Sequence, residues 1–387
     1  MLESPPSIDQ QPIEAVSRST WDVIVVGAGP AGGIAAHVLA GRGMRVLLVD
    51  RAQFPREKAC GDALAPEAVQ VLQKVNLAQS IQPWAFATPG YTMVSPAGSS
   101  ADIACPMTLI RRRILDALVA GSAVANGAVF ARAHLDKAAL RNDGVECAFG
   151  RSLHQCQALI VATGASHEIL RSLGLAENAQ PDGIALRRYY RSSVGPERPC
   201  FFFRKEFLPG YAWIFPLGGQ EYNVGCGRFS CPSKAGKAPL HRLFESFLQE
   251  EPMAQRLVCN STSVSPVRGA ILRCGVRGRP PPCCGRVLLV GEIIGTTVPG
   301  WGEGISLAMR TGLLAAEAVL AAEQEHDLGQ LAEYARGVRQ KIKPVTRRNQ
   351  LFTLLFAQVW ATNLFVALAR RSSLVRRLVA KQKPSSE

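Results

Sequence analysis

The fold is decided by Asp22-Val-Ile-Val-Val-Gly-Ala-Gly-Pro-Ala-Gly-Gly-Ile-Ala-Ala-His-Val-Leu-Ala-Gly-Arg-Gly-Met-Arg-Val-Leu-Leu-Val-Asp50, near the start of a chain of 387 residues. The stretch predicts a strand, a tight turn, a helix and a second strand. Residues 23–26 are apolar and β-branched, which is typical of a strand buried on both faces. The turn contains Gly27, Gly29 and Gly32 as G-x-G-x-x-G, in which the glycines permit the turn, backbone approach to a pyrophosphate and close helix packing.

This unit predicts a dinucleotide site. The start of the helix, including Ala31, directs free N–H groups and the helix dipole at phosphates. The second strand ends at Asp50, where a carboxylate takes the ribose hydroxyls of an adenosine, and Arg51 follows as a further expected contact. The acid argues against NADP, whose 2′-phosphate it would repel. The motif alone leaves FAD, NAD and an ordinary glycine-packed turn open.

Composition limits the class of protein. A hydrophobic content of 47% over 387 residues suits two or three domains, or one large α/β domain with an inserted second one. Eleven cysteines without C-x-x-C spacing argue against a disulfide scaffold and a structural metal, and favour a reducing cytoplasm. Residues 1–20 are polar and contain proline, which predicts a flexible leader.

The C-terminal region is basic and apolar. The net charge is +14, and residues 331–387 hold 12 Lys or Arg against two acids. Residues 351–369 carry no charge, which predicts a helix that packs on the body or lies at a membrane surface, with a spanning helix as the alternative. Alternation of basic and apolar residues favours peripheral membrane contact over nucleic acid. The expected headgroup contacts are Arg347, Arg348, Arg370, Arg371, Arg376 and Arg377.

Four blocks of sequence carry a family resemblance. The first is residues 27–32, and the second is Phe-Pro-Arg-Glu-Lys-Ala-Cys-Gly-Asp at 54–62. The third is Gly-Glu-Ile-Ile-Gly-Thr-Thr-Val-Pro-Gly-Trp-Gly-Glu-Gly-Ile at 291–305, and the fourth is Gly-Tyr-Ala-Trp-Ile-Phe-Pro at 210–216. Together they resemble the geranylgeranyl reductase family of FAD flavoproteins, within the larger group that includes the aromatic hydroxylases. The first and third blocks mark the larger group, the second and fourth are more specific to the reductases, and the resemblance spans about residues 20 to 330.

The resemblance implies FAD as the cofactor. Glu292 stands where the family has Asp, at a strand end from which an acid can bond the ribityl chain. A helix N-terminus beside the flavin can stabilise its anionic reduced ring. Arg112 matches the family's R-x-x-x-D, with a solvated arginine as the alternative. The remaining expected contacts are Gly164, Gly302, Gly304 and Ile305.

Cys60 is the expected catalytic residue, because the resemblance implies that the cysteine of this motif takes part in alkene reduction. Arg56 and Lys58 are predicted to lower its pKa. The alternative is a cysteine that serves as a small buried hydrophobe.

The fourth block predicts a substrate wall. Tyr211, Trp213 and Phe215 alternate at period two and therefore share one face of a strand. Such a wall suits an apolar chain, with ordinary core packing as the alternative.

We therefore interpret the sequence as an α/β protein with three parts. A Rossmann-like FAD-binding domain carries an inserted antiparallel-sheet substrate domain, followed by a C-terminal helical region. The predicted bounds are 1–20 for the leader, 21–83 with 105–183 and 281–330 for the FAD-binding domain, 84–104 with 184–280 for the substrate domain, and 331–387 for the helical region.

The expected function is FAD-dependent reduction of carbon–carbon double bonds in an isoprenoid: a geranylgeranyl or polyprenyl lipid, a prenylated quinone or a pigment. There is no second dinucleotide fingerprint, so the external reductant is NAD(P)H bound transiently or a reductase protein. The alternatives are a flavin-dependent monooxygenase or halogenase acting on an aromatic substrate, and a non-catalytic lipid-binding flavoprotein. The expected location is the cytoplasm, with peripheral membrane contact.

Overall fold

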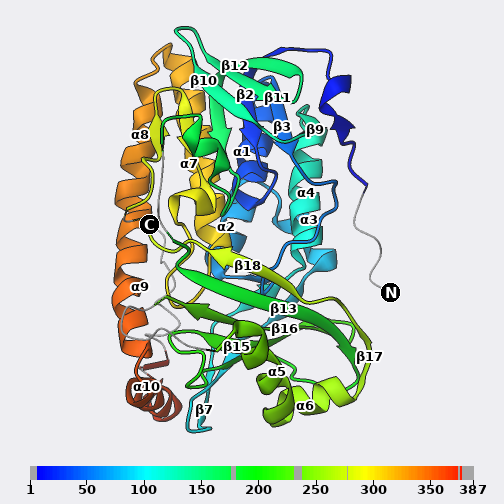
Figure 1. The fold of residues 1–387 in the computed structure, drawn as a ribbon, viewed down its shortest axis with the longest axis vertical. Helices are drawn as coiled ribbons and strands as arrows, with labels where there is room; N and C mark the ends of the chain where they lie inside the picture. Colours follow the sequence, from blue (N-terminus) through cyan, green and yellow to red (C-terminus); the bar gives the residue numbers. More distant parts are fainter. Residues whose placement is uncertain (1–6, 176–179, 231–237, 277, 374, 377–387) are drawn as a thin grey trace.

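Two large β-sheets lie one above the other along the long axis of the molecule (Figure 1). The structure is a computed structural model that describes residues 7–175, 180–230, 238–276, 278–373 and 375–376, with the side chains of 351 and 352 excepted. One sheet has nine strands and the other eight, and a three-stranded sheet lies beside them. The predicted α/β class, with a C-terminal helical region, is confirmed.

The nine-stranded sheet has a parallel centre. Its strand order is β1-β9-β3-β2-β12-β11-β10, and β20 pairs with β12. The central strands have no polar face because helices cover them, so residues 23–25 and 46–49 are fully buried. The parallel strands are β2 (Thr20–Val26), β3 (Val46–Asp50), β9 (Val129–Arg132), β12 (Ser152–Val161) and β20 (Val287–Leu289). The main covering helices are α1 (Pro30–Ala40), α4 (Arg112–Ala125) and α7 (Ile305–Glu325).

Four further pairings extend this sheet. Three are antiparallel: β11 (Val145–Phe149) with β12, β10 (Lys137–Leu140) with β11, and β19 (Cys283–Cys284) with β20. The fourth is β1 (Gln11–Pro12), which pairs in parallel with β9. Gln10 also bonds the backbone of Ala52 and Phe54, at 3.0 and 2.8 Å. Part of the predicted flexible leader is therefore tied to the sheet, because its backbone finds partners at the edge strand.

The eight-stranded sheet has the order β17-β13-β16-β15-β14-β6-β7, with β18 also paired to β13. All pairings are antiparallel except β14 with β6, so the sheet is mixed where a purely antiparallel one was expected. Helices α5 (Leu240–Glu250) and α6 (Pro252–Cys259) contact this sheet at β13, and α5 also contacts β16. The strands are β6 (Tyr91–Val94), β7 (Ser100–Ile103), β13 (Gly183–Ser192), β14 (Cys200–Phe202), β15 (Tyr211–Gly218), β16 (Glu221–Phe229), β17 (Ser261–Val264) and β18 (Arg268–Leu272).

The three-stranded sheet lies beside the helices α2 (Pro66–Lys74) and α3 (Ala78–Ile81). Its strands are β4 (Ala63–Leu64), β8 (Met107–Leu109) and β5 (Phe86–Thr88). The chain thus places β5 outside the substrate sheet, although its residues were assigned to that sheet. Single 3-10 turns occur at Ile13–Ala15, Gln82–Trp84, Glu168–Arg171 and Gly291–Ile294.

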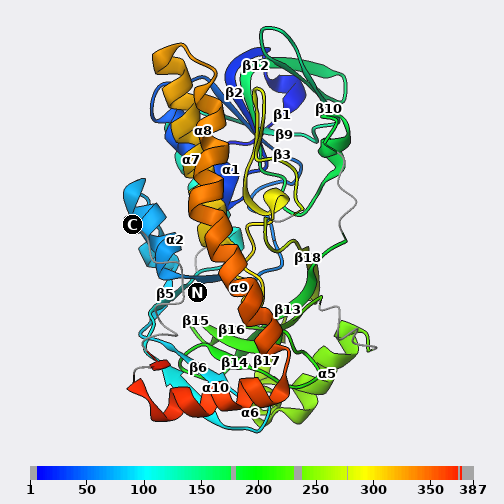
Figure 2. The same cartoon turned by 90° about the vertical axis from the view of Figure 1, so that its left-hand side faces the viewer.

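The C-terminal helices run from one sheet to the other. Helix α8 (Gln330–Gly337) continues through a π-helical turn at Val338–Ile342 into α9 (Lys343–Phe356). Helix α10 (Val359–Arg371) then turns by 107° and lies along the eight-stranded sheet, against β7 (Figure 2). The uncharged stretch 351–369 is therefore two helices, because Gln358 takes an extended conformation between them. Helix α7 has the length and apolarity of a membrane span, but 61% of its apolar window is buried inside the protein.

Candidate active site

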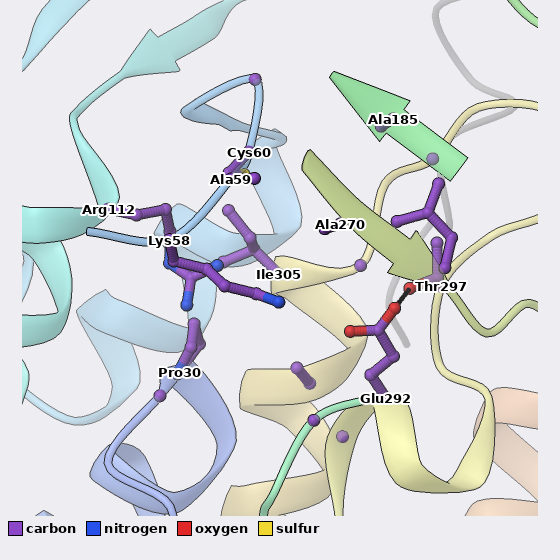
Figure 3. A pocket seen from close by; sticks show the side chains of 18 of the residues that line it. Pro30, Lys58, Ala59, Cys60, Arg112, Ala185, Ala270, Glu292, Thr297 and Ile305 are labelled. Atoms are coloured by element: carbon purple, nitrogen blue, oxygen red, sulfur yellow. Dashed lines mark hydrogen bonds between the residues drawn. The ribbon is translucent and has the colours of Figure 1, made fainter. Parts of the chain in front are cut away.

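One cavity of about 490 Å³ lies between the two large sheets. One wall comes from turns at the carboxyl ends of β2, β3, β12 and β20, and the other from the inner face of β13, β15 and β16. Figure 3 shows the side chains that point into it from both sides. The lining includes these residues predicted from the sequence: Gly27, Gly29, Ala31, Asp50, Arg51, Cys60, Arg112, Gly164, Tyr211, Trp213, Phe215, Glu292, Gly302, Gly304 and Ile305.

The glycine turn has no room for side chains at its first and third positions. Gly27 has a φ of +105°, and a Cβ there would lie 2.2 Å from the Ala162 oxygen. A Cβ on Gly32 would lie 1.9 Å from the Gly27 oxygen, so Gly32 packs against the turn and does not line the cavity. These contacts match the close backbone packing that a dinucleotide cradle requires.

Two guanidinium groups face the middle glycine. A Cβ on Gly29 would lie 3.6 Å from an Arg56 nitrogen and 3.8 Å from an Arg112 nitrogen. Arg112 is buried and bonds Asp116 through Nε and Nη2, at 2.8 and 2.7 Å. Burial opposes the charge of Arg112, but Asp116 outweighs it and raises the arginine's pKa. The backbone and charge at this point fit a pyrophosphate, as in FAD.

Asp50 is held ready by its own turn. Its carboxylate accepts hydrogen bonds from the N–H groups of Ala28 and Ala52, both at 2.9 Å, and from Arg56 Nε at 3.5 Å. The orientation is therefore set by backbone, which suits recognition of ribose hydroxyls. Arg51 is exposed at the rim of the cavity.

Lys58, in the loop after β3, and Glu292, after β20, point toward each other from opposite sides of the cavity (Figure 3). Glu292 Oε1 accepts from the Arg273 N–H at 3.1 Å and from the Thr297 hydroxyl at 3.5 Å. Burial raises the pKa of Glu292, and the charge of Lys58 opposes that rise. Burial likewise lowers the pKa of Lys58, against the charge of Glu292. The charges of Lys58 and Glu292 therefore stabilise each other across the cavity that Gly27 and Gly29 also line.

A third turn completes the cofactor wall. Gly164 has a φ of +67°, and a Cβ there would lie 4.0 Å from Glu292 Oε2. Gly302 has a φ of +64°, and Gly304 precedes α7 as its N-cap. The Ser306 N–H donates to Glu303 Oε1 at 2.9 Å, so an acid already caps this helix.

The loop that carries Cys60 is fastened to the opposite sheet. Asn223 Nδ2 donates to the Cys60 oxygen at 2.7 Å and to Asp62 Oδ2 at 2.8 Å. The Tyr189 hydroxyl also donates to Asp62 Oδ2, at 2.6 Å, and the Asp62 N–H donates to Cys60 Sγ at 3.4 Å. The bonds from Asn223 and Tyr189 join residues far apart in sequence and hold the Cys60 loop against the eight-stranded sheet.

The electrostatic expectation for Cys60 is wrong in sign. Burial raises the pKa of the Cys60 thiol, and the nearby charge of Arg112 offsets that effect only in part. Lys58 also interacts with Cys60 electrostatically, but Arg112 is the main opposing charge. Burial dominates because it removes the water that would solvate a thiolate. The thiol is therefore protonated at neutral pH.

The aromatic wall is continuous. Tyr211, Trp213 and Phe215 line the cavity from β15, with successive ring centroids 6.0 Å apart. Trp213 Nε1 donates to Asn223 Oδ1 at 2.9 Å, and a Cβ on Gly61 would lie 3.2 Å from the Phe215 ring. The wall therefore abuts the Cys60 loop and presents apolar surface next to the thiol.

Sequence reasoning missed four residues of the site. Asp62 lies inside the second quoted block, so its proximity to Cys60 was a usable signal. The other three come from distant strands and have no local signature: Arg187, Tyr189 and Asn223.

The comparisons with known sequences agree with this geometry. The FAD binding domain family matches residues 20–147. A menaquinone reductase from Mycolicibacterium smegmatis is 33% identical over 322 residues, which cover 76% of this chain and 75% of that protein. A digeranylgeranylglycerophospholipid reductase from Methanopyrus kandleri is 32% identical over 321 residues, which cover 79% of this chain and 82% of that protein.

Solved structures share the fold. A geranylgeranyl bacteriochlorophyll reductase-like protein from Thermoplasma acidophilum has a TM-score of 0.80 at 20% identity, over 95% of this chain and 98% of that one. A flavin-dependent brominase has a TM-score of 0.75 at 19% identity, over 94% and 93% of the two chains. These likenesses concern the fold alone. The sequence identity to the two reductases, over three quarters of the chain, establishes that this protein belongs to the geranylgeranyl reductase family of FAD-dependent oxidoreductases.

Proposed function

We propose that this oxidoreductase reduces carbon–carbon double bonds in an isoprenoid chain. The observation that carries the proposal is a half-buried, protonated thiol, Cys60, lying in one cavity with a dinucleotide cradle and an aromatic wall. The names of the two reductase relatives support an isoprenoid lipid or quinone as the substrate class.

The cofactor wall has the groups that FAD needs. Gly27 and Gly29 admit the pyrophosphate, Arg56 and Arg112 neutralise it, and Asp50 takes the adenosine ribose. Glu292 is the partner for the ribityl chain. FAD, once reduced by NAD(P)H or by a reductase protein, supplies a hydride for one alkene carbon.

Cys60 supplies the proton for the other carbon. Its raised pKa keeps the thiol protonated, and Asn223 and the Asp62 N–H hold its position. The charge of Arg112 favours the thiolate that remains after proton transfer. The aromatic rings of β15 align an apolar chain and exclude water, which an unactivated alkene needs because it accepts hydride poorly.

Anaerobic single turnover tests the proposal. The FAD-loaded protein is reduced with dithionite, mixed with geranylgeranyl or short polyprenyl substrates under nitrogen, and the products are analysed by mass spectrometry. We expect flavin reoxidation without O₂ and a mass gain of two hydrogens per reduced bond. Reoxidation that requires O₂, with an oxygenated or halogenated product, would identify a monooxygenase or halogenase instead.

We also propose that the corner between α9 and α10 contacts membrane lipid. The exposed apolar side chains there include Trp360, which is 65% exposed. Arg347 and Arg348 on α9 and Arg370 and Arg371 on α10 are exposed. Arg376 is half-buried and donates to the Ala369 and Arg370 oxygens, and Arg377 lies outside the described residues. The exposed apolar residues of this corner are Leu354, Leu355, Val359, Trp360, Leu364 and Leu368. The apolar side chains would insert into the bilayer while the basic residues contact the headgroups. Each basic residue near an anionic surface contributes about 1 kcal/mol to binding, and salt weakens this contribution.

Vesicle co-sedimentation tests this contact. Binding should require anionic lipid, decrease with salt and weaken in Trp360→Ser. Leu153→Ser, an equally drastic change of an exposed leucine on β12, is the control and should bind as the wild type does. Equal binding by Trp360→Ser, or none to any vesicle, would overturn the contact. Binding that resists high salt and carbonate would indicate a spanning segment.

A further inference from the structure

One charged side chain stands in the otherwise apolar and aromatic part of the cavity wall. Arg187 on β13 lines the cavity and is only 1% exposed. A charged residue this deep is rare unless it is paired, because burial removes the water that solvates it. A charged side chain in a wall of apolar and aromatic residues needs polar partners, which either the protein or a ligand in the cavity can supply.

The strand register places Arg187 beside Trp213. Arg187 pairs with Gly225 on β16, and Gly225 pairs with Trp213 on β15. Directly opposed residues of antiparallel strands point to the same face, so the guanidinium and the indole flank one glycine. A Cβ on Gly225 would lie 2.3 Å from the indole. The missing side chain therefore gives the tryptophan room next to the arginine.

The guanidinium is only partly satisfied. One Nη donates to Glu57, and the group stacks 3.9 Å from the centroid of the Tyr189 ring. Arg187 Nε is buried and has no acceptor among the described residues. A buried donor without an acceptor costs free energy, which an acceptor brought by a ligand would recover.

The ion pair of Arg187 with Glu57 indicates which kind of ligand oxygen can accept from Arg187 Nε. Glu57 neutralises Arg187, so a phosphate at this point would have to displace the glutamate or lie beside it. A neutral oxygen needs only the N–H. Resting on the proposed function, we propose that Arg187 determines specificity by donating from Nε to a neutral carbonyl oxygen, of the quinone type, on the head of the isoprenoid substrate.

Equilibrium dialysis against the oxidised, FAD-loaded protein tests this role without turnover. The probes are 2,3-dimethyl-1,4-naphthoquinone and 2,3-dimethylnaphthalene, which share a shape but differ in the carbonyl oxygens. The wild type should prefer the quinone by about tenfold, the value of one good hydrogen bond. The variant Arg187→Met with Glu57→Gln, which leaves no unpaired carboxylate, should lose the preference and keep its affinity for the hydrocarbon.

The matched control is Arg188→Met, because neighbouring residues of a strand point to opposite faces. It should keep the tenfold preference. If the double variant does not retain FAD, Arg187→Leu with Glu57→Leu, which replaces the ion pair by apolar side chains and leaves no donor, should show the same loss.

An unchanged preference in both Arg187 variants, or no preference in the wild type, would overturn the role of Arg187. Tighter binding of geranylgeranyl phosphate that depends on Arg187 would overturn the choice of a neutral acceptor. If the wild type prefers the quinone through Arg187 but reduces no alkene, the role of Arg187 stands and only the proposed function is contradicted.

Discussion

The two walls of the cavity are built by different means. The cofactor wall consists largely of backbone: Gly27, Gly164 and Gly302 have positive φ, and the acids Asp50 and Glu292 are held by N–H groups. The substrate wall consists of side chains from β13, β15 and β16, which contact one another across strands. The first wall is specified by turns at strand ends, and the second by which strands lie next to each other.

This difference determines how each wall should respond to substitution. At Gly27 and Gly32 a Cβ would meet backbone atoms at 2.2 and 1.9 Å, and these positions tolerate no added atom because backbone cannot move away cheaply. A substitution in a wall of packed side chains removes only the contacts of that one side chain. The resulting loss of stability depends on which polar groups are left without a partner. Substitutions on the two walls therefore separate a failure to fold or bind FAD from a failure to position the substrate.

The largest effect is expected for Gly32→Ala on the cofactor wall. Its Cβ would meet the Gly27 oxygen at 1.9 Å, so the variant should lose about 3 kcal/mol or more of stability and retain no FAD. Gly121→Ala in α4 is the control, because its Cβ would meet only the Ile8 side chain at 3.8 Å. That change should be neutral or stabilising by about 0.5–1 kcal/mol. Urea unfolding and the FAD content measure both, and equal effects would refute the backbone account of this wall.

The next effect is expected for Asn223→Leu on the substrate wall. The change leaves the Trp213 N–H and the Asp62 carboxylate each with one partner fewer inside the protein. Unfolding should become about 2–4 kcal/mol easier, with FAD retained. Asn363→Leu removes a single exposed hydrogen bond, to the Ala97 N–H, and should cost less than about 1 kcal/mol. Loss of FAD in Asn223→Leu would show that the two walls are not separable.

A smaller effect is expected at the junction of the walls. Cys60→Ser should keep FAD and slow flavin reoxidation by the alkene about tenfold to a hundredfold, because a hydroxyl is a weaker proton donor. Since burial raises the pKa of Cys60, the wild-type rate should stay level through neutral pH and fall only as the pH rises through that raised value. Anaerobic stopped-flow measures both, with Cys283→Ser, which lies outside the cavity lining, as the control. An undiminished rate would return Cys60 to a packing role.

The smallest effect is expected for Glu292→Gln, which should weaken FAD binding about tenfold, or about 1–2 kcal/mol, since the charge-assisted bond to the ribityl chain is lost. Glu292→Asp, the acid of the family, should restore the affinity in a titration of apoprotein. Unchanged affinity in the glutamine variant would mean that Glu292 serves another partner.

The same residue predicts a pH dependence of the apoprotein. Burial raises the pKa of Glu292, so the folded state holds this proton more tightly than the unfolded chain does. The contribution of Glu292 to the free energy of unfolding is fully present below its ordinary pKa of about 4.3. It is lost as the pH rises through the raised pKa of the folded state. Glu292→Gln should remove that loss in urea unfolding measured across the window. An identical pH dependence in the variant would contradict the assignment.

The amino-acid sequence by itself determined the first turn of the cofactor wall. A strand that is apolar on both faces, a turn with glycine at its crowded positions and an acid at the next strand end are requirements of neighbouring residues, so they appear in one stretch from 22 to 50. The aromatic residues of β15 were predictable for the same reason, because alternation at period two is local.

Only the tertiary structure decided how the thiol is held and what faces it. The partners Asn223 and Tyr189 lie more than a hundred residues from Cys60 in the chain, and strand register alone brings them to the loop. The sign of the Cys60 pKa shift was mispredicted because desolvation depends on what covers the thiol, and the charges next to it in sequence do not measure that. Arg187 belongs to no sequence motif either, because its proposed role depends on Gly225 and Trp213, which strand pairing brings beside it.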